Sequence, residues 1–499
     1  MSLYSLFDSV ANSMPEQTAL VFGEVRVSYG RLAEAVRRLA NGLRSLGVAP
    51  GDRVAILLPN VPHFPISYYA VLALGAVAVP VNFLIRPQGL RSLLADSGAK
   101  VLITWDGFRH LFTGVLQEGI ACQKVVVLGE HCPSFARPLT LLMQESGSDL
   151  EFEPAAETVP AAINYTAGTA HDSLGAVMTH QALLTNMQTS REMFHINEND
   201  RIAAVIPMCH SLAQVLCMHL SLLSGATLVL ISRFQPKPVM EILGKEGVTF
   251  LPAVPSLIAA LADTDETERA LPDLKAVLCY GGRVDELMVK KFEERFSTRL
   301  FVGYGLTEAG PLVSCHRLYS DYRPNSVGQP LVGTEVQILD ETGTLLSPYA
   351  TGEIWVKSPS IMSAYYNHPD QTALQLKDGW LFTGDIGYID LDHYLYVVER
   401  KEDLIIKSGF PIFPHEVEDI LCSHSAVAEA AVVGVGANAQ SPDVKAFIVL
   451  CAGAQVQENE LIELCKQALP MYKCPRFIEF CSALPKSPTG RVLKRLLRS

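Results

Sequence analysis

The fold is decided by a pattern that first appears at residues 31–58, RLAEAVRRLANGLRSLGVAPGDRVAILL. In its first part, apolar residues recur at helical spacing on one face: Leu32, Val36, Leu39, Leu43 and Leu46. Gly47 suits the position just past a helix end, where the backbone is often left-handed. The unbroken apolar run 53–58 follows and is stopped by Pro59. This stretch therefore predicts a helix followed directly by a buried strand.

The same alternation continues toward residue 302. Helical patterns lie between short apolar runs, which occur at 76–81, 101–104, 125–128, 203–206, 226–231 and 276–279. Strands that are buried on both faces have this continuous apolar character, and they occur in parallel sheets covered by helices. The sequence therefore predicts an α/β fold in which a large N-terminal region contains parallel-type sheets covered by helices.

The pattern changes twice further along the chain. Between residues 333 and 396, short strands alternate with tight turns, which predicts a smaller, mostly antiparallel β section. After Arg400, a helix starting at Pro414, two apolar runs and a helix near 458–469 predict a small α+β domain. The charged run 399–403 is either a linker or an exposed turn. We expect an N-terminal domain at 1–399 and a C-terminal domain at 400–499.

Composition excludes several classes of protein. Apolar residues make up 49% of the 499 residues, which is too many for a disordered chain. The net charge of −12 argues against binding a long polyanion, so we expect no nucleic-acid partner. Proline and histidine interrupt the longest apolar stretches, so we expect no integral membrane segment. Eleven cysteines without a C-x-x-C pair fit a reducing compartment, and we expect a cytoplasmic protein.

Three segments carry residues suited to chemistry. The first, YTAGTAHDSLG at 165–175, contains Thr166, Gly168 and Thr169 and follows an apolar run. Such a loop either binds an anion through N–H groups and hydroxyls or is an ordinary turn.

The second segment, GYGLTEAGP at 303–311, directly follows an apolar run, and the Gly281-Gly282-Arg283 triplet ends another run in the same way. Open α/β sheets bind ligands at the carboxyl ends of their strands. The third segment, WLFTGDIGY at 380–388, places Asp385 between glycines, where a carboxylate either accepts from ribose hydroxyls or caps a turn.

In this order and spacing, the segments resemble one family, the adenylate-forming acyl-CoA synthetases with the luciferases and the peptide-synthetase adenylation domains. Further motifs match along essentially the whole chain: VSYGRL at 27–32, GEIWVK at 352–357, SAYYN at 363–367, DGW at 378–380, IFPHEVE at 412–418 and PKSPTG at 485–490. The resemblance is closest to fatty or aryl acyl-CoA ligases.

The resemblance implies a two-step reaction and a mobile C-terminal domain. A carboxylic acid attacks the α-phosphate of ATP and gives acyl-AMP and pyrophosphate. A thiol, of CoA or of a carrier protein, then displaces AMP after the C-terminal domain rotates. The implied cofactors are ATP or AMP, Mg²⁺ and CoA, and the implied partner is a small carboxylic acid.

The resemblance also assigns roles to individual residues. The nucleotide would be bound by the loop residues Thr166, Gly168 and Thr169, and by Gly281, Gly282, Arg283, Tyr304, Gly305, Asp385 and Arg400. Within this set, Tyr304 would stack on adenine, and Asp385 and Arg400 would bind ribose. Catalytic roles would fall to Thr307 at the α-phosphate, to Glu308 as the Mg²⁺ ligand, to His210 near the acyl group and to Arg491. Glu402 would be the hinge, and Gly409 would lie beside the thiol tunnel.

Two departures from the family pattern bear on activity. The family's phosphate loop reads Tyr-Thr-Ser-Gly-Thr-Thr-Gly-x-Pro-Lys-Gly, whereas this chain has different residues at five positions: Ala167, Ala170, His171, Ser173 and Leu174. The family's adenylation lysine is replaced by Arg491. Leu174 and Arg491 both affect the ATP-handling step, because a charge-assisted phosphate contact contributes about 1.5–3 kcal/mol.

Three hypotheses therefore stand. The chain is an acyl-CoA ligase with altered triphosphate handling, a family member that uses the adenylate with another nucleophile, or a non-catalytic pseudo-ligase that binds nucleotide or acyl ligand. Adenine, ribose and Mg²⁺ positions that match the family favour retained nucleotide binding in all three.

Overall fold

The helix and strand expected at 31–58 are α2, Tyr29–Ser45, and β3, Arg53–Leu57. The side chain of Ser28 accepts a hydrogen bond of 3.4 Å from the N–H of Arg31 and so caps the start of α2. The apolar face of α2 is buried, and four of the five residues of β3 are buried. The predictions of a helix and of a buried strand in this stretch are therefore confirmed.

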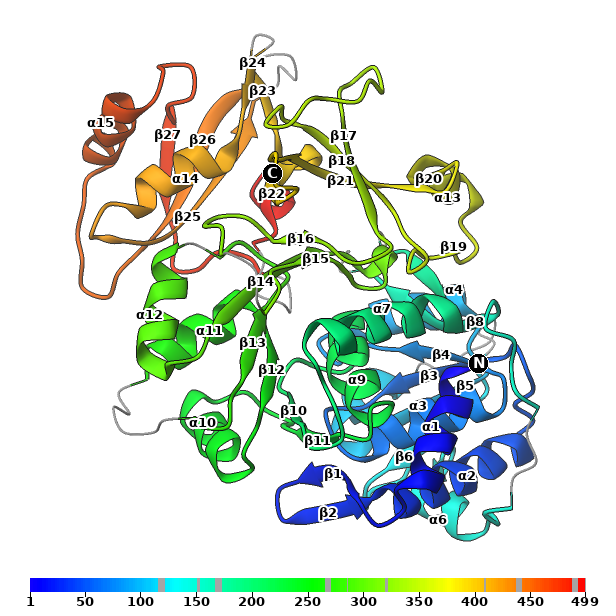
Figure 1. Ribbon diagram of the computed structural model, residues 1–499. Helices are drawn as coiled ribbons and strands as arrows, with labels where there is room; N and C mark the ends of the chain where they lie inside the picture. Colours follow the sequence, from blue (N-terminus) through cyan, green and yellow to red (C-terminus); the bar gives the residue numbers. More distant parts are fainter. Residues whose placement is uncertain are drawn as a thin grey trace. The chain divides into compact units, whose positions relative to one another are not determined.

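The computed structural model describes residues 1–114, 122–149, 153–166, 173–264, 271–284, 286–318, 322–407, 410–436, 442–486 and 492–498. The chain divides into two compact units (Figure 1). Unit 1 comprises Met1–Glu335 and Val356–Leu381, and unit 2 comprises Val336–Trp355 and Phe382–Ser499. Among the residues so described, no helix is long and apolar enough to cross a membrane.

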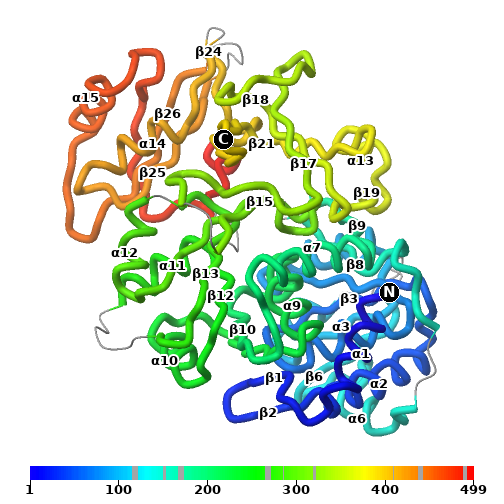
Figure 2. The backbone as a smooth tube through the Cα atoms, in the orientation of Figure 1, coloured from blue at the N-terminus to red at the C-terminus, as the bar shows by residue number. Residues whose placement is uncertain are grey.

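Unit 1 contains an eight-stranded sheet in the order β19-β9-β8-β4-β3-β5-β6-β7. Its strands are β19 (Ala364–Tyr365), β9 (Gly175–Thr179), β8 (Pro160–Tyr165), β4 (Val77–Pro80), β3, β5 (Val101–Trp105), β6 (Lys124–Leu128) and β7 (Arg137–Pro138). The strands from β8 to β7 run parallel, and β9 pairs antiparallel with both β8 and β19. Figure 2 shows β19, from late in the chain, beside β9 of this sheet, and α13 (Pro369–Gln375) follows β19.

Unit 1 also contains a nine-stranded sheet in the order β16-β15-β14-β13-β12-β10-β11-β1-β2. Its strands are β16 (Gln329–Pro330), β15 (Leu312–Cys315), β14 (Leu300–Gly305), β13 (Ala276–Cys279), β12 (Phe250–Ala253), β10 (Arg201–Ala204), β11 (Thr227–Leu230), β1 (Thr18–Phe22) and β2 (Val25–Ser28). The core of this sheet is parallel. Helix α10 (Pro236–Lys245) connects β11 to β12, α11 (Pro255–Ala262) connects β12 to β13, and α12 (Glu286–Phe296) connects β13 to β14.

Unit 2 holds most of the predicted β section, which is made of β17 (Glu335–Leu339), β18 (Gly352–Lys357), β20 (Leu376–Lys377), β21 (Trp380–Ile389) and β22 (Leu395–Arg400). It continues with η4 (Lys401–Asp403), β23 (Ile405–Lys407) and β24 (Phe410–Ile412). The chain then forms α14 (Pro414–Cys422), β25 (Val427–Val435), β26 (Asp443–Leu450), α15 (Glu458–Ala468) and β27 (Phe477–Phe480). Its last described element is η5, Lys494–Leu497.

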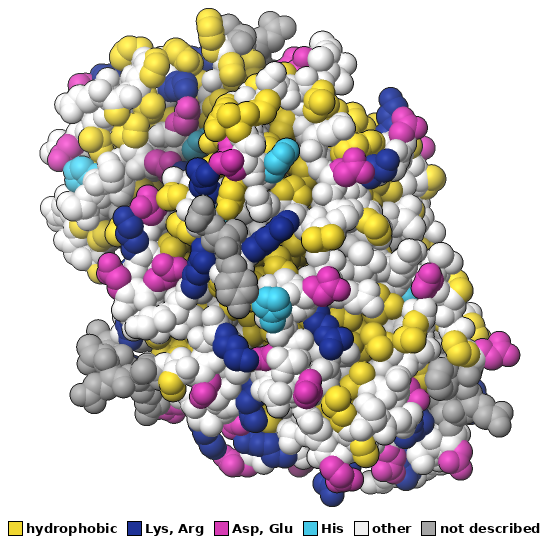
Figure 3. All heavy atoms as spheres, in the orientation of Figure 1, with side chains coloured by type: hydrophobic (Ala, Val, Ile, Leu, Met, Phe, Trp, Pro, Cys, Tyr) yellow, Lys and Arg dark blue, Asp and Glu magenta, His cyan; other side chains and the backbone are white. Residues whose placement is uncertain are grey.

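The predicted fold class is confirmed: parallel-type sheets covered by helices, a smaller β section and a small α+β C-terminal part. The compact units group the β section with the C-terminal part. The boundary at 399 and 400 concerns motion rather than compactness, so it stays a prediction. The face in Figure 3 carries acidic, basic and apolar side chains intermingled, as expected from a chain with 18% charged residues.

Candidate functional site

The predicted nucleotide residues of unit 1 lie at the carboxyl ends of two neighbouring parallel strands. Strands β13 and β14 pair in the register Cys279 with Val302, so both strands end at the same edge of the sheet. Gly281, Gly282 and Arg283 follow β13 and are exposed. The second segment, residues 303–311, begins within β14 and continues past its last residue, Gly305. Residues 281–283 and the second segment, each predicted to follow a buried strand, therefore lie at one edge of the sheet, and their assignment to the nucleotide stays a prediction.

Gly305 is required by close packing at the end of β14. A Cβ atom there would lie 2.1 Å from the carbonyl oxygen of Pro311 and 2.9 Å from the hydroxyl of Tyr280. That hydroxyl already donates a hydrogen bond of 2.6 Å to the Pro311 carbonyl. Since backbone and a bonded side chain occupy the space, only glycine fits here. Tyr304 is half-buried on the strand just before this position.

Thr307 and Glu308 lie in η3, Thr307–Ala309, immediately after β14. The Tyr365 hydroxyl donates a hydrogen bond of 2.7 Å to Oε1 of Glu308. The backbone N–H of Met362 donates to the Glu308 carbonyl at 2.8 Å. Both partners come from the segment around β19, so this segment fixes the position of the carboxylate from outside its own strand. Sequence reasoning missed Tyr365, although it lies inside the SAYYN motif.

His210 and Ser211 lie near Thr307 in unit 1. The Ser211 and Thr307 hydroxyl oxygens are 3.5 Å apart, at the outer limit of a hydrogen bond. The Nε2 atom of His210 is buried and has no hydrogen-bond partner among the described residues. Burial lowers the pKa of His210 to about 4, so its imidazole is neutral near pH 7. A neutral ring with one unpaired nitrogen is suited to bonding a polar group of a ligand.

Thr166, at the start of the predicted phosphate loop, is hydrogen-bonded to Leu174 at its end. Its N–H donates to the Leu174 carbonyl at 2.9 Å, and its hydroxyl oxygen accepts from the Leu174 N–H at 3.1 Å. Because the oxygen accepts this bond, the hydroxyl proton can still be donated to an anion. Ser173 donates its hydroxyl to the Thr166 carbonyl at 2.5 Å. Gly168 and Thr169 of the predicted set, together with Ala167, Ala170 and His171, lie outside the described residues.

In unit 2, Asp385 and Arg400 form an ion pair across strands β21 and β22, where they are direct register partners. The Nε of Arg400 lies 2.7 Å from Oδ1 of Asp385. The Asp385 side chain is 7% exposed, and the residue follows Gly384, whose φ of +71° is a left-handed value that favours glycine. The ion pair holds the Asp385 carboxylate in place on β21.

Arg491 and Gly409 lie outside the described residues, but the chain that flanks Arg491 is described. Lys486 and Val492 form a β-bridge, and the N–H of Leu493 donates to the Pro485 carbonyl at 2.7 Å. These two contacts join the chain before and after residues 487–491. We call residues 485–486 and 492–493 the C-terminal stem.

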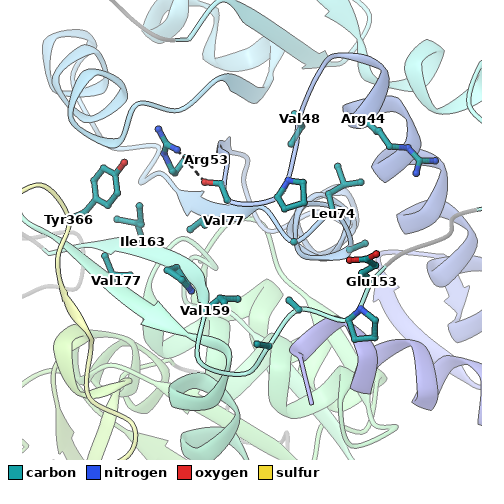
Figure 4. Close-up of a pocket in the computed structure, with 18 residues that line it drawn as sticks. Arg44, Val48, Arg53, Leu74, Val77, Glu153, Val159, Ile163, Val177 and Tyr366 are labelled. Atoms are coloured by element: carbon teal, nitrogen blue, oxygen red, sulfur yellow. Dashed lines mark hydrogen bonds between the residues drawn. The ribbon is translucent and has the colours of Figure 1, made fainter.

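A pocket of about 700 Å³ lies elsewhere in unit 1, and none of the predicted site residues lines it (Figure 4). Its walls are mainly apolar, with Val77, Ile163 and Val177 contributed by the eight-stranded sheet. Arg53 lines it too, but its guanidinium donates to the carbonyls of Ser97, Gly51 and Gly98. The Arg53 guanidinium is therefore engaged by backbone carbonyls. This pocket does not correspond to the predicted nucleotide site.

Comparison with known proteins gives the same assignment for both parts of the chain. Residues 7–366 match the family model described as AMP-binding enzyme, and residues 416–491 match the AMP-binding enzyme C-terminal domain. The long-chain-fatty-acid–CoA ligase of Bacillus subtilis is 32% identical over 525 residues, covering 99% of this chain and 94% of that protein. A feruloyl-CoA synthase of an Amycolatopsis species is 32% identical over 502 residues, covering 98% and 96%.

Solved structures are similar over the whole chain. The o-succinylbenzoate CoA synthetase of Bacillus subtilis, in complex with its acyl-adenylate intermediate, has a TM-score of 0.89 at 29% identity and covers 100% of this chain and 98% of that one. An anthranilate CoA ligase in complex with anthranoyl-AMP has a TM-score of 0.92 at 24% identity, with coverage of 100% and 96%. The second likeness concerns the fold alone.

Proposed function

The chain belongs to the AMP-binding enzyme family, and on that premise we propose that it activates a carboxylic acid with ATP and transfers the acyl group to the thiol of CoA. In the first step a carboxylate oxygen bonds to the α-phosphorus, and the bond to the leaving pyrophosphate breaks. In the second step the thiol sulfur bonds to the acyl carbon, and AMP leaves. The observation that carries the proposal is the arrangement of Tyr304 at the end of β14 and of Thr307 and Glu308 in η3, with His210 and Ser211 beside Thr307.

Nucleotide recognition is divided among several segments. We assign the adenine to Gly281, Gly282, Arg283, Tyr304 and Gly305, because exposed glycines and a half-buried ring leave room for a planar base. We assign the ribose hydroxyls to Asp385, which Arg400 holds in place. We assign the phosphates to the loop that begins at Thr166 and contains Gly168 and Thr169.

Mg²⁺ is part of the proposal, and the described residues fit it. They contain no group of three or more histidine, cysteine, aspartate or glutamate side chains that could hold a metal. Mg²⁺ bound with a nucleotide usually takes only one or two carboxylates and fills its other positions with phosphate oxygens and water. Glu308 supplies one carboxylate, oriented by Tyr365. When bound, the ion would neutralise charge on the phosphates as pyrophosphate leaves.

The two residues that differ from the family pattern, Leu174 and Arg491, affect only the first step. Leu174 cannot give the cation that the family places at this point of the loop, and Arg491 presents a broad guanidinium where a compact ammonium is usual. They favour a second candidate function, a pseudo-ligase that binds nucleotide or acyl ligand without turnover. ATP–pyrophosphate exchange with a panel of carboxylic acids separates the two: exchange with any acid supports the ligase, whereas nucleotide binding without exchange supports the pseudo-ligase.

The acid that we propose is hydrophobic. Relatives that match over nearly the whole chain are named for long-chain fatty acids and for ferulate, both of which join a carboxylate to an apolar body. A carrier-protein thiol remains the alternative acceptor to CoA, and comparing CoA with a phosphopantetheinylated carrier protein in the second step decides between them. Since ATP and CoA are cytoplasmic metabolites, we propose that the enzyme works in the cytoplasm.

We further propose that residues 400–499 move as a domain relative to residues 1–399 between the two steps, with Glu402 as the hinge. Glu402 lies in η4, a single short turn between β22 and β23, and its side chain is exposed. Hinges are a few positions that absorb large changes in backbone angles.

A further inference from the structure

Lys494 lies in a cluster of largely buried charged side chains in unit 2. Its Nζ atom is 2.9 Å from Oε1 of Glu418 and 3.6 Å from Oε2 of Glu399. The side chains of Lys494, Glu418 and Glu399 are 11%, 17% and 10% exposed. Exposed ion pairs contribute little, but a buried charge that loses its partner is costly. The geometry of this cluster therefore depends on Lys494 being present.

Glu399 is held by more than one neighbour. It accepts from the N–H of Arg400 at 3.1 Å and from the N–H of His415 at 3.3 Å, and the His415 Nδ1 lies 3.6 Å from its Oε2. Burial by itself raises the pKa of Glu399, but His415, Lys494 and the Arg400 N–H together lower it to about 2. Glu399 is therefore ionised at neutral pH and available to bind Lys494.

The same cluster connects the C-terminal stem to the strand that carries Arg400. Lys494 directly follows Leu493 of the stem, and Glu399 directly precedes Arg400. A second ion pair, between Arg498 and Asp403 at 2.7 Å, ties the chain beyond Lys494 to η4. The end of the chain is thus held at two points against residues 399–403.

We propose that Lys494 is a positioning residue for the adenylation step. By binding Glu399 and Glu418 it fixes the C-terminal stem. The second part of the stem begins at Val492, which is the next residue in the chain after Arg491. This inference rests on the proposed function, in which Arg491 serves adenylation. Lys494 thereby fixes the position of Val492, the residue that directly follows Arg491 in the chain.

The cluster also crosses the proposed hinge. Glu399 precedes Glu402, whereas Lys494 and Glu418 follow it, so rotation about Glu402 separates Lys494 from Glu399 and leaves Lys494 with Glu418. The contact with Glu399 therefore belongs to one of the two conformations, and its loss affects one half-reaction. A residue that only stabilised the fold would affect both.

Two half-reactions measured on the full-length chain test this. Adenylation is followed as pyrophosphate release with palmitate or ferulate and ATP, and transfer as CoA thioester formation from the synthetic acyl-adenylate. Lys494→Met is expected to slow adenylation at least about tenfold and to change transfer less than about twofold. Lys494→Arg is expected to restore most of the adenylation rate, because it returns the cation to the two carboxylates.

The matched control is Lys486→Met, which makes the same change on the other side of the β-bridge of the stem. Lys486 pairs with Glu429 at 2.7 Å, but both side chains are about 40% exposed, so both rates are expected to stay within about twofold of wild type. Glu399→Gln keeps the side-chain shape and is expected to slow adenylation as Lys494→Met does. The double variant is expected to add little, because both changes remove one contact.

Equal slowing of both half-reactions in Lys494→Met, with no recovery in Lys494→Arg, would show a purely structural role and overturn the inference. Wild-type rates in Lys494→Met would overturn it as well, while leaving the proposed function intact. A wild-type chain inactive in both half-reactions with every acid tested would overturn the proposed function, and this inference with it.

Discussion

The hydroxyl of Tyr365 lies 2.7 Å from Oε1 of Glu308, across 57 residues of sequence. The segment that carries Tyr365 also binds the far end of the phosphate loop, because the N–H of Tyr366 donates to the Gly175 carbonyl at 2.8 Å. One short segment therefore fixes both the carboxylate assigned to Mg²⁺ and the strand at which the loop 166–174 ends. Neither β14 nor β9 could by itself set the distance between the Glu308 carboxylate and the end of the phosphate loop.

Tyr365→Phe is expected to slow pyrophosphate release about ten- to a hundredfold and to raise the Mg²⁺ concentration needed for half-maximal rate. A hydrogen bond to a charged group contributes about 1.5–3 kcal/mol, and its loss lets the carboxylate turn away. The Mg²⁺ dependence of the initial rate measures the effect.

Tyr366→Phe is the matched control, since it removes the hydroxyl of the next residue and leaves Glu308 bonded. Its Mg²⁺ dependence should follow that of wild type. If both variants shift alike, or if Tyr365→Phe shifts nothing, Tyr365 does not orient Glu308.

Asp385→Ala is expected to weaken AMP binding about tenfold or more, because the ribose loses an acceptor and Arg400 loses the partner that holds it at 2.7 Å. Calorimetry with AMP measures the affinity. Asp392→Ala, at an exposed turn of the same hairpin, is the control and should bind as wild type does. Equal affinities in the two variants would contradict the ribose assignment.

Leu174→Lys and Arg491→Lys return the residues that the family usually has. If Leu174 and Arg491 limit adenylation, each change should accelerate pyrophosphate release about ten- to a hundredfold. Their effects need not add, because both act on one transition state. The four proteins compared are wild type, each single variant and the double variant. A fast wild type with slower variants would show instead that the loop has adapted to a different phosphate geometry, and His171→Ala should then also be slow.

Glu402→Pro is expected to impair one half-reaction more than the other, because proline fixes φ near −65° and restricts the residue before it. The comparison of pyrophosphate release with thioester formation from the acyl-adenylate measures the difference. Equal effects on both steps, or no effect on either, would count against a hinge at this position.

The buried histidines of unit 1 should make its stability depend on pH. Burial lowers the pKa of His219 to about 3 from the ordinary 6.5, and His219 is 0% exposed. Because the unfolded chain binds the proton more tightly, stability is complete above about pH 6.5 and falls as the pH drops toward 3. At pH 5 the loss from this residue is about 2 kcal/mol. The thermal midpoint should therefore fall between about pH 7 and about pH 5, and less steeply in His219→Gln. An unchanged slope in that variant would contradict the assignment.

The sequence by itself determined the fold class, and local physics explains why. The helical period of 31–47 and the unbroken apolar run 53–58 each depend on neighbours in the chain, and both became the elements expected, α2 and β3. The motif at residues 303–311 was recognisable because the strand, the turn and the functional side chains follow one another directly in the sequence. The family and the acyl-CoA-ligase-like activity, predicted from the motif series, are confirmed by the matches over the whole chain.

Tertiary structure alone decided how distant segments share one function. Tyr365 stood in a motif already quoted, yet nothing in its neighbourhood indicated that its hydroxyl would bind Glu308, because that contact exists only once β19 pairs with β9. Lys494 lies three residues after Arg491 in the sequence, outside every motif quoted above. Its partners Glu399 and Glu418 lie 95 and 76 residues earlier in the chain. Charges so far apart attract only after the apolar core of unit 2 has brought them together and removed the water between them.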